Sequence, residues 1–392
     1  MTRWIALLSF AVSLHAFSQT PAPPDAQARF LAGLPVDGTP LEGLAKEKTW
    51  QEHAHQFDTS WKELNSRQIS KIKDWSQKTL PDVCGTTGNV FYTFSGPDML
   101  YVQAFFPHAS TYVMCGLEPV GPVPDVQSFP AGSMSQVLGN LRKSLNAVLE
   151  FSFFRTIAMK DDLSGKQLRG TIPVIYVFLA RAGAKVESAE LVTLDDDGKF
   201  VTNEAPTDDT KKPEGDAKKS DAPKRVLIHG AKITFTMAGG SPQTAYYFSS
   251  DLSNDGIKKH KGFVAFCNSL GQGVGFAKAA SYLMHEDYFS SVRDFLLANC
   301  TAIVQDDSGI PVKYFPKDRW AVQYFGHYAG PIDMFKKSYQ PAISAAMKDK
   351  DSKSLPFSFG YRWHSNESSI IVATALKSIP KAEPVKEGAG SQ

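Results

Sequence analysis

The stretch "NVFYTFSGPDMLYVQAFFPHASTYVMCGLEPVG", residues 89–121, decides the fold that the sequence predicts. Apolar and aromatic residues dominate it, and turn-forming residues interrupt it at 95–98 and at 107–108. Runs rich in Val, Phe and Tyr that are bounded by such clusters are typical of β-strands. We therefore expect three strands between Asn89 and Glu118.

Helical patterns flank this stretch. Residues 46–79 carry large apolar side chains at helical spacing, which predicts a long N-terminal amphipathic helix that ends before Pro81. Residues 134–159 predict a second helix, and "TIPVIYVFLAR" (171–181) a strand. Further strands are expected at 226–237, 244–250, 301–305 and 311–315 and in two final runs, "LPFSFGYRW" and "SSIIVATAL". Further helices are expected at 275–285, 287–298 and 332–348, the last of them after an aromatic segment, "WAVQYFGHY". Hairpins that cluster beside helices favour an α+β fold, with antiparallel or mixed sheets packed against several helices.

A charged segment divides the chain. Residues 203–225 contain six acidic residues, six basic residues and three prolines, but no large apolar residue. Such a segment cannot bury enough surface to offset its ordering entropy, so we expect a long disordered insertion. It either links two domains, 46–202 and 226–376, or lies between two strands of a single sheet. A flexible tail is expected at 377–392.

The first residues predict export. "MTRWIALLSFAVSLHAFSQT" has an early cation, a short apolar run and small residues around Phe17, which is the pattern of a cleaved signal peptide at 1–18. A Pro-rich leader follows at 19–45. No other long apolar run appears, so we expect no transmembrane segment in the mature chain and a periplasmic or extracellular location. With 42 Lys and Arg against 40 Asp and Glu, the chain has no basic excess for nucleic acid.

Four cysteines are present, which is an even number in a chain expected to meet an oxidising compartment. The local pairings would be Cys84 with Cys115 and Cys267 with Cys300. The alternative is four small buried thiols. None of the spacings is C-x-x-C, so a structural zinc or redox motif is not expected.

Two motifs are weak matches to ligand sites. Gly271, Gly273 and Gly275 precede a predicted helix, but the third glycine of a dinucleotide fingerprint would fall where Phe276 stands. The stretch 193–204 places Asp195, Asp197 and Glu204 at ligand positions of a calcium loop, but Thr193 occupies its first position. We therefore predict no cofactor, and read both as turns.

The histidines and their aromatic neighbours supply the remaining candidates. His53 and His55 lie two apart on a helix, so they project to different sides and are read as a solvated pair. His327, Tyr328, Tyr361, Arg362 and His364 are candidates for a cleft that binds a small molecule, a glycan or an envelope partner. Asp306 and Asp307 in "VQDDSGIPVKYF" are read first as a type I turn at a hairpin corner, because Asp and Gly occupy its first and fourth positions.

Two functions from different classes follow. The first is a non-enzymatic ligand-binding or envelope-associated protein. The alternative is an extracytoplasmic hydrolase of glycan or peptide, with His327, His364 and Asp306 or Asp307 as acid and base. The alternative requires these side chains to meet around an open pocket.

Overall fold

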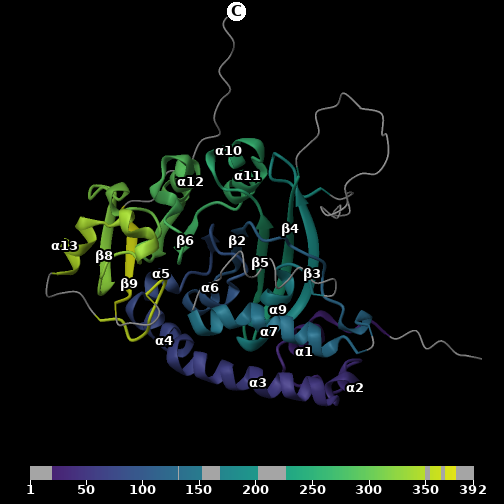
Figure 1. The fold of residues 1–392 in the computed structure, drawn as a ribbon. Helices are drawn as coiled ribbons and strands as arrows, with labels where there is room; N and C mark the ends of the chain where they lie inside the picture. The colour runs from purple at the N-terminus through teal and green to yellow at the C-terminus, as the bar shows by residue number, and fades with distance from the viewer. Residues whose placement is uncertain are drawn as a thin grey trace, which may run out of the picture.

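A single mixed β-sheet organises the molecule in the computed structural model of the chain (Figure 1). The structure describes residues 20–130, 132–151, 168–201, 227–348, 354–362 and 367–376. The strands are β1 (Asn89–Tyr92), β2 (Thr111–Gly116), β3 (Ala184–Leu194), β4 (Ile228–Met237), β5 (Pro242–Ser249), β6 (Gly273–Ala277), β7 (Cys300–Gln305), β8 (Trp320–Gly326) and β9 (Ser369–Ala375). The predicted α+β class with a mixed sheet is confirmed.

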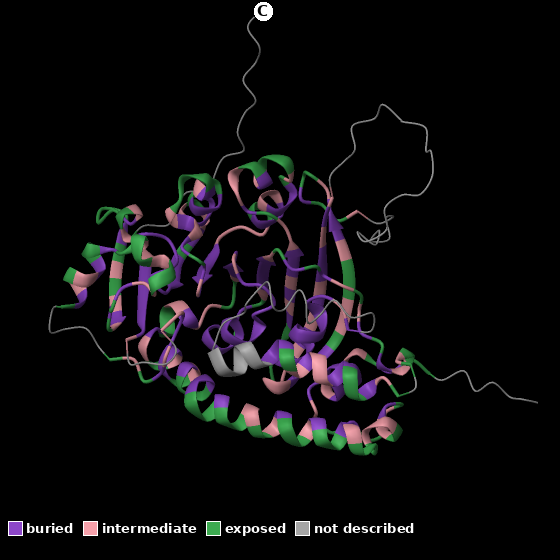
Figure 2. Cartoon of the chain, in the orientation of Figure 1, coloured by how far each residue is buried: buried purple, intermediate pink, exposed green. Residues whose placement is uncertain are grey.

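The strand order is β3-β4-β5-β2-β1-β6-β7-β9-β8. The central strands β5, β2, β1, β6 and β7 are parallel to one another, and the two strands at each end are added antiparallel. The central strands are buried on both faces, as parallel strands generally are (Figure 2). β3 and β8 are therefore the two edges of the sheet.

Helices cover both faces. One apolar core contains side chains of the helices on the first face, and a second core contains those on the other face. The first face carries α1 (Pro24–Leu31), α3 (Lys48–Leu64), α4 (Ser70–Thr79), α6 (Met99–Phe105), α7 (Met134–Phe151) and α9 (Ile172–Arg181), and the second carries α11 (Gly262–Ser269) and α12 (Ser290–Asn299) with α10 (Asn254–Lys259) beside them. The shorter helices are α2 (Glu42–Ala45), α5 (Pro81–Cys84) and α13 (Pro341–Met347), and a π-helical turn, η1 (Asn65–Ile69), joins α3 to α4. Short 3-10 turns are η2 (Val126–Ser128), η3 (Leu283–His285), η4 (Asp287–Phe289), η5 (Val312–Tyr314) and η6 (Asp333–Ser338).

Two predicted strands are helices. The middle of 89–121 forms α6, whose N-cap Asp98 accepts a hydrogen bond from the backbone N–H of Tyr101 at 3.1 Å. The crossover through α6 makes β1 and β2 parallel rather than a meander. "TIPVIYVFLAR" forms α9, which is buried on all sides and has a proline in its first turn. Short apolar runs of this kind fit a buried strand and a buried helix equally well.

Other segments form a different type of element from the one that the sequence predicts. Residues 275–277, expected to begin a helix over 275–285, end β6, and η3 follows at Leu283–His285. Residues 311–315 contain η5 instead of a strand. "LPFSFGYRW" forms no strand over its described residues, 355–362. His53 is buried rather than solvated: its Nε2 lies 2.9 Å from the Leu31 carbonyl and burial lowers its pKa to about 4.

The halves on either side of residues 203–225 share the sheet. β3 and β4 are antiparallel neighbours, so this segment lies between two strands of one sheet. β1 and β2 lie between β5 and β6, so strands of the two halves are interleaved. The predicted disorder at 203–225, the signal peptide at 1–18 and the tail at 377–392 lie outside the described residues.

The four cysteines are free, buried thiols. Cys84 belongs to the core on one face of the sheet, and Cys115 to the core on the other, so the sheet separates this pair. Cys267 and Cys300 share the second core but are not bonded. Within the described ranges, no helix is both long and apolar enough to cross a membrane.

Candidate functional site

The carboxyl ends of the central strands gather charged side chains. α6 follows β1 on one face of the sheet and α12 follows β6 on the other, so the chain switches direction between these two neighbouring strands. Ligands of open sheets bind at such switch points. Asp98 follows β1, Lys278 directly follows β6, and Asp306 and Asp307 directly follow β7.

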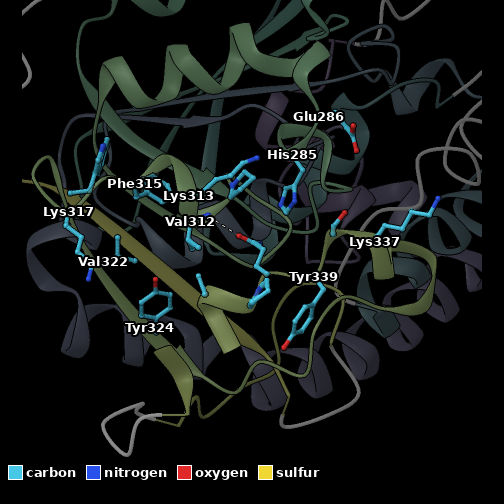
Figure 3. A pocket seen from close by; sticks show the side chains of 16 residues that line it. His285, Glu286, Val312, Lys313, Phe315, Lys317, Val322, Tyr324, Lys337 and Tyr339 are labelled. Carbon is cyan, nitrogen blue, oxygen red and sulfur yellow. Dashed lines mark hydrogen bonds between the residues drawn. The ribbon is translucent and has the colours of Figure 1, made fainter. Parts of the chain in front are cut away.

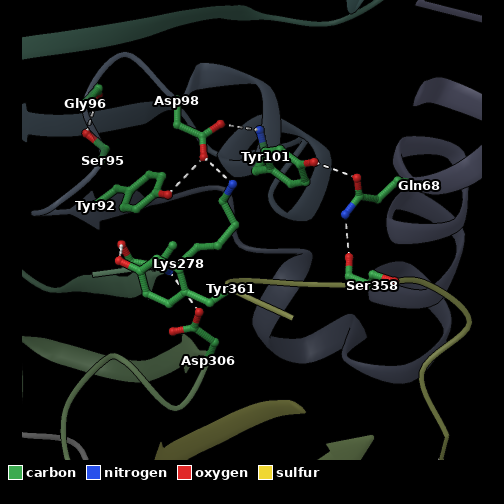
Figure 4. Close-up of polar contacts among 11 residues, drawn as sticks. Gln68, Tyr92, Ser95, Gly96, Asp98, Tyr101, Lys278, Asp306, Ser358 and Tyr361 are labelled. Carbon is green, nitrogen blue, oxygen red and sulfur yellow. Dashed lines mark hydrogen bonds and ion pairs between the residues drawn. The ribbon is translucent and has the colours of Figure 1, made fainter. Parts of the chain in front are cut away.

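Lys278 and Asp98 form a buried ion pair across the switch point (Figure 4). Nζ of Lys278 lies 2.9 Å from Oδ2 of Asp98 and 3.5 Å from the ring centroid of Tyr101. The same Oδ2 accepts a hydrogen bond from the Tyr92 hydroxyl at 3.0 Å. Burial lowers the pKa of Lys278, while the charge of Asp98 opposes this shift.

The two neighbouring aspartates have separate partners. Asp306 accepts hydrogen bonds from the N–H of Ala279 at 2.9 Å, from the N–H of Ser308 at 3.0 Å and from the Ser308 hydroxyl. Asp307 accepts one from the Tyr282 hydroxyl at 2.6 Å. Burial, reinforced by the charge of Asp306, raises the pKa of Asp307 to about 7, and burial also raises the pKa of Asp306. The pair therefore holds a proton at much higher pH than exposed aspartates do.

The loop after β6 is strained. Ala279, Ser281 and Tyr282 have φ angles of 50°, 53° and 55°, a region that costs non-glycine residues of the order of 1–3 kcal/mol each. Asp306 holds the N–H of Ala279, and the Tyr361 hydroxyl accepts from the N–H of Ser281 at 3.1 Å. Strain of this kind gathers at functional sites, which marks this loop as part of the candidate site.

A pocket of about 750 Å³ adjoins this loop (Figure 3). Its apolar wall includes Val312, Phe315, Trp320, Val322, Tyr324 and Tyr339. Gln340 connects it to the aspartates: its Nε2 donates to the Asp307 carbonyl at 3.0 Å, and its Oε1 accepts from the N–H of Val312 at 2.9 Å. The Tyr282 ring, whose hydroxyl bonds Asp307, lies 5.1 Å from the ring of His285, which also lines the pocket.

The polar groups of the pocket are mostly basic. Lys313, Lys317 and Lys337 line it, against a single acidic residue, Glu286. None of the three lysines forms an ion pair with a residue in the described part of the chain. Burial lowers the pKa of His285 to about 4, so its imidazole is neutral near pH 7. The pocket therefore combines aromatic walls with an excess of positive charge.

The residues predicted for a cleft are distributed around this region. Tyr328 is buried and its hydroxyl accepts the N–H of Gln340 at 3.0 Å. Arg362 donates to the carbonyls of Gly330 and Pro331, at 2.9 and 3.0 Å. His327 follows β8 and is exposed. None of these three residues, nor Tyr361, lines the pocket, and His364 lies outside the described residues.

The predicted turns, and the candidate metal ligands that the structure describes, lie at the ends of strands or within them. Residues 306–309 form the predicted turn, in which the N–H of Gly309 donates to the Asp306 carbonyl at 3.3 Å. The turn follows a central parallel strand, β7, and leads into η5, so it is not the corner of a hairpin. Gly273 and Gly275 lie inside β6, where an added Cβ would come within 2.5 Å of the Asn89 carbonyl oxygen and 3.1 Å of Ile303. Oδ1 of Asp195 is occupied by the N–H groups of Asp197 and Lys199, and Glu204 is not among the described residues. No metal-ligand cluster occurs in the described ranges.

Sequence reasoning missed Asp98, Lys278, Tyr282 and Gln340. Lys278 had a usable signal, because a cation that directly follows the apolar run "VGFA" is what the end of a buried strand at a ligand-binding edge would show. Comparison of the chain with protein-family models, curated proteins and solved structures finds no match. Function is therefore argued from the site, because a fold alone does not determine it.

Proposed function

We propose that this protein binds an amphipathic, anionic ligand in the pocket beside β8. The observation that carries the proposal is the combination of an aromatic wall with three lysines and one glutamate in a pocket of about 750 Å³. Ligand sites typically have volumes of roughly 300–1,000 Å³, mostly apolar walls and a few polar groups that fix orientation. An apolar ligand body would pack against the wall while its acidic group meets the lysines.

Charge favours an anion over a neutral ligand. Lys313, Lys317 and Lys337 are exposed, and the structure gives them no acidic partner in the part of the chain it describes. His285 adds no charge near pH 7, because burial lowers its pKa to about 4. An anion at the mouth would therefore meet three lysines, and Glu286 is the single acidic residue among those that line the pocket.

One observation favours hydrolysis as a second candidate. Burial and the charge of Asp306 raise the pKa of Asp307 to about 7, a value suited to a general acid or base. Asp307 does not line the pocket, however, and Gln340 lies between it and the pocket. Binding is therefore the better supported function, and the aspartate pair serves to position the pocket wall.

We also propose that the protein acts outside the cytoplasm, on the strength of the signal-peptide pattern at 1–18. Intact-mass measurement of the protein isolated from its native host should give a chain that begins at Gln19. A chain that retains residues 1–18 would refute export by this signal.

Fluorescence titration tests the binding proposal. The anionic probe 8-anilinonaphthalene-1-sulfonate should bind to the folded protein more tightly than the neutral probe N-phenyl-1-naphthylamine, and the difference should shrink as salt is added. Replacing Lys313, Lys317 and Lys337 by glutamine should weaken binding of the anionic probe and leave binding of the neutral probe unchanged. Replacing Lys71, Lys258 and Lys259, which are exposed lysines outside the pocket, is the matched control. Failure of both probes to bind would overturn the proposal.

A further inference from the structure

Backbone groups on the outer edge of β8 have no hydrogen-bond partner among the residues that the structure describes. β8 pairs only with β9 among the described strands, in antiparallel register. The N–H of His327 donates to the Ser368 carbonyl, and the N–H of Leu376 donates to the Arg319 carbonyl. Because hydrogen-bonded positions alternate along an antiparallel pair, the odd-numbered residues of β8 face β9. The N–H and C=O groups of Val322 and Tyr324 therefore point to the free edge.

The same residues also line the pocket. Trp320, Val322 and Tyr324 alternate along β8, so their side chains lie on one face of the sheet, and all three belong to the pocket wall. α13 packs on this face, where Ile343 and Ile371 share a small core with Val322 and Tyr324. A strand added along β8 would thus place every second side chain on the face that carries the pocket.

We propose that the ligand of this pocket is an extended acidic segment of another polypeptide, which adds to β8 as the next strand. The inference rests on the proposed function and specifies its ligand class. Main-chain hydrogen bonds to an edge strand supply affinity in this mode of recognition, and pockets for alternate side chains supply specificity. β8 offers both, because Val322 and Tyr324 present free main-chain groups beside their own pocket-lining side chains.

Charge identifies the occupant. The pocket contains three lysines and one glutamate, and β8 itself has no charged residue. A second copy of this chain, paired through β8, would bring another set of lysines to the same groove and no acidic residue from its own β8. An acidic segment from a partner instead complements the lysines, and such complementarity also accelerates association.

A designed peptide tests the inference. The probe is a fluorescein-labelled heptapeptide, Thr-Glu-Thr-Phe-Thr-Glu-Thr, whose Glu, Phe and Glu fall on one face of a strand at the spacing of Trp320, Val322 and Tyr324. We expect saturable binding, at least tenfold weaker when both glutamates are replaced by lysine. N-methylation of the Phe amide, which faces β8 in antiparallel pairing, should weaken binding by a similar factor. The matched control is N-methylation of the threonine that directly precedes the Phe, because the amide of that threonine faces away from β8.

Hydrogen exchange measured by NMR reports the pairing directly. The amides of Val322 and Tyr324 should exchange rapidly in the free protein and at least tenfold more slowly with the peptide, whereas those of Ala321 and Gln323 should be slow in both. Binding without this protection, or equal binding of both N-methylated peptides, overturns strand addition. If the anionic naphthalene probe binds and the peptide does not, the inference of strand addition is overturned and the proposed function stands. A dimer formed through β8 that excludes the peptide also overturns the inference.

Discussion

The two edges of the sheet are built differently. β3 carries an ion pair between Lys185 and Glu187 at 2.9 Å and has a bulge between Val186 and Ser188. α1 packs against it, and the outward N–H of Val186 donates to Asp25 of that helix at 3.1 Å. β8 has no charged residue and no bulge in its pairing with β9.

The difference separates an edge that avoids partners from one that is open to them. Charged side chains, bulges and covering helices are the usual means of preventing an edge strand from pairing with another chain. β3 has all three, whereas β8 has no charged residue and no bulge, and the helix that contacts it, α13, packs on the face that carries Val322 and Tyr324. The open edge is also the one beside the pocket, as the proposed strand addition requires.

The largest expected effect is the loss of Trp320 from β8. Its side chain is only 3% exposed and packs edge-on against Phe315 at 5.4 Å, so Trp320→Ala should lower the free energy of unfolding by about 3–5 kcal/mol. Leu191→Ala on β3, where the side chain is 37% exposed, is the matched control and should cost less than about 1 kcal/mol. Urea denaturation measures both. Equal losses of stability would contradict the expected difference in packing between these two side chains.

Asp307, which lies behind the pocket, should make the free energy of unfolding depend on pH. Because the pKa of Asp307 is raised to about 7 in the folded protein, the folded state retains a proton that the unfolded state releases near pH 4. The contribution of Asp307 to stability should therefore fall as pH rises from about 4 to 7, by at most about 1.4 kcal/mol per pH unit for one proton, and then level off. His53 and His285 contribute with the opposite sign between about pH 4 and 6.5, because burial lowers their pKa values to about 4.

Denaturation at a series of pH values checks this expectation. Between pH 4 and 7, Asp307→Asn should make the slope of the free energy of unfolding against pH more positive than in the wild type, whereas Glu187→Gln, which removes a carboxylate at the β3 edge, should preserve the wild-type slope. If Asp307→Asn leaves the slope unchanged, the proton is not held at this aspartate.

Strands that have a clear pattern in their own sequence could be predicted from it. The sequence predicts β7 and β9, because each is a short run rich in apolar and β-branched residues. The sequence predicts strands where α6 and α9 lie, because a short apolar run has no periodicity that separates a buried helix from a buried strand. That ambiguity also hid the parallel centre of the sheet, since reading α6 as a strand turns a crossover into a meander.

The candidate site was harder to predict, because it is assembled from distant segments. Asp306 and Asp307 were recognised as conspicuous, but a short Asp-rich sequence cannot show whether it ends a hairpin or a central strand. Lys278 meets Asp98 only because β1 pairs with β6, a contact between segments some 180 residues apart. The raised pKa of Asp307 arises from burial, which depends on the complete fold.

A pair of proline variants tests the alternation along β8. The N–H of Gln323 faces β9, so Gln323→Pro should leave a carbonyl of β9 without its donor, whereas the N–H of Val322 faces the free edge. We expect Gln323→Pro to lower the free energy of unfolding by about 1–3 kcal/mol more than Val322→Pro does. Thermal and urea denaturation give the comparison. The reverse order would contradict the assignment of the free backbone groups.

The smallest effect on stability is expected at β3. Replacing Lys185, Glu187 and Glu190 by valine removes exposed charges, so the free energy of unfolding should change little. Self-association should nevertheless increase, because the variant edge loses the charges that discourage strand pairing. Sedimentation velocity over a range of concentrations should show a monomer for the wild type and dimers for the variant. A variant that stays monomeric would show that the bulge and the Asp25 contact protect this edge without charge, and that β8 is open because it lacks those two features.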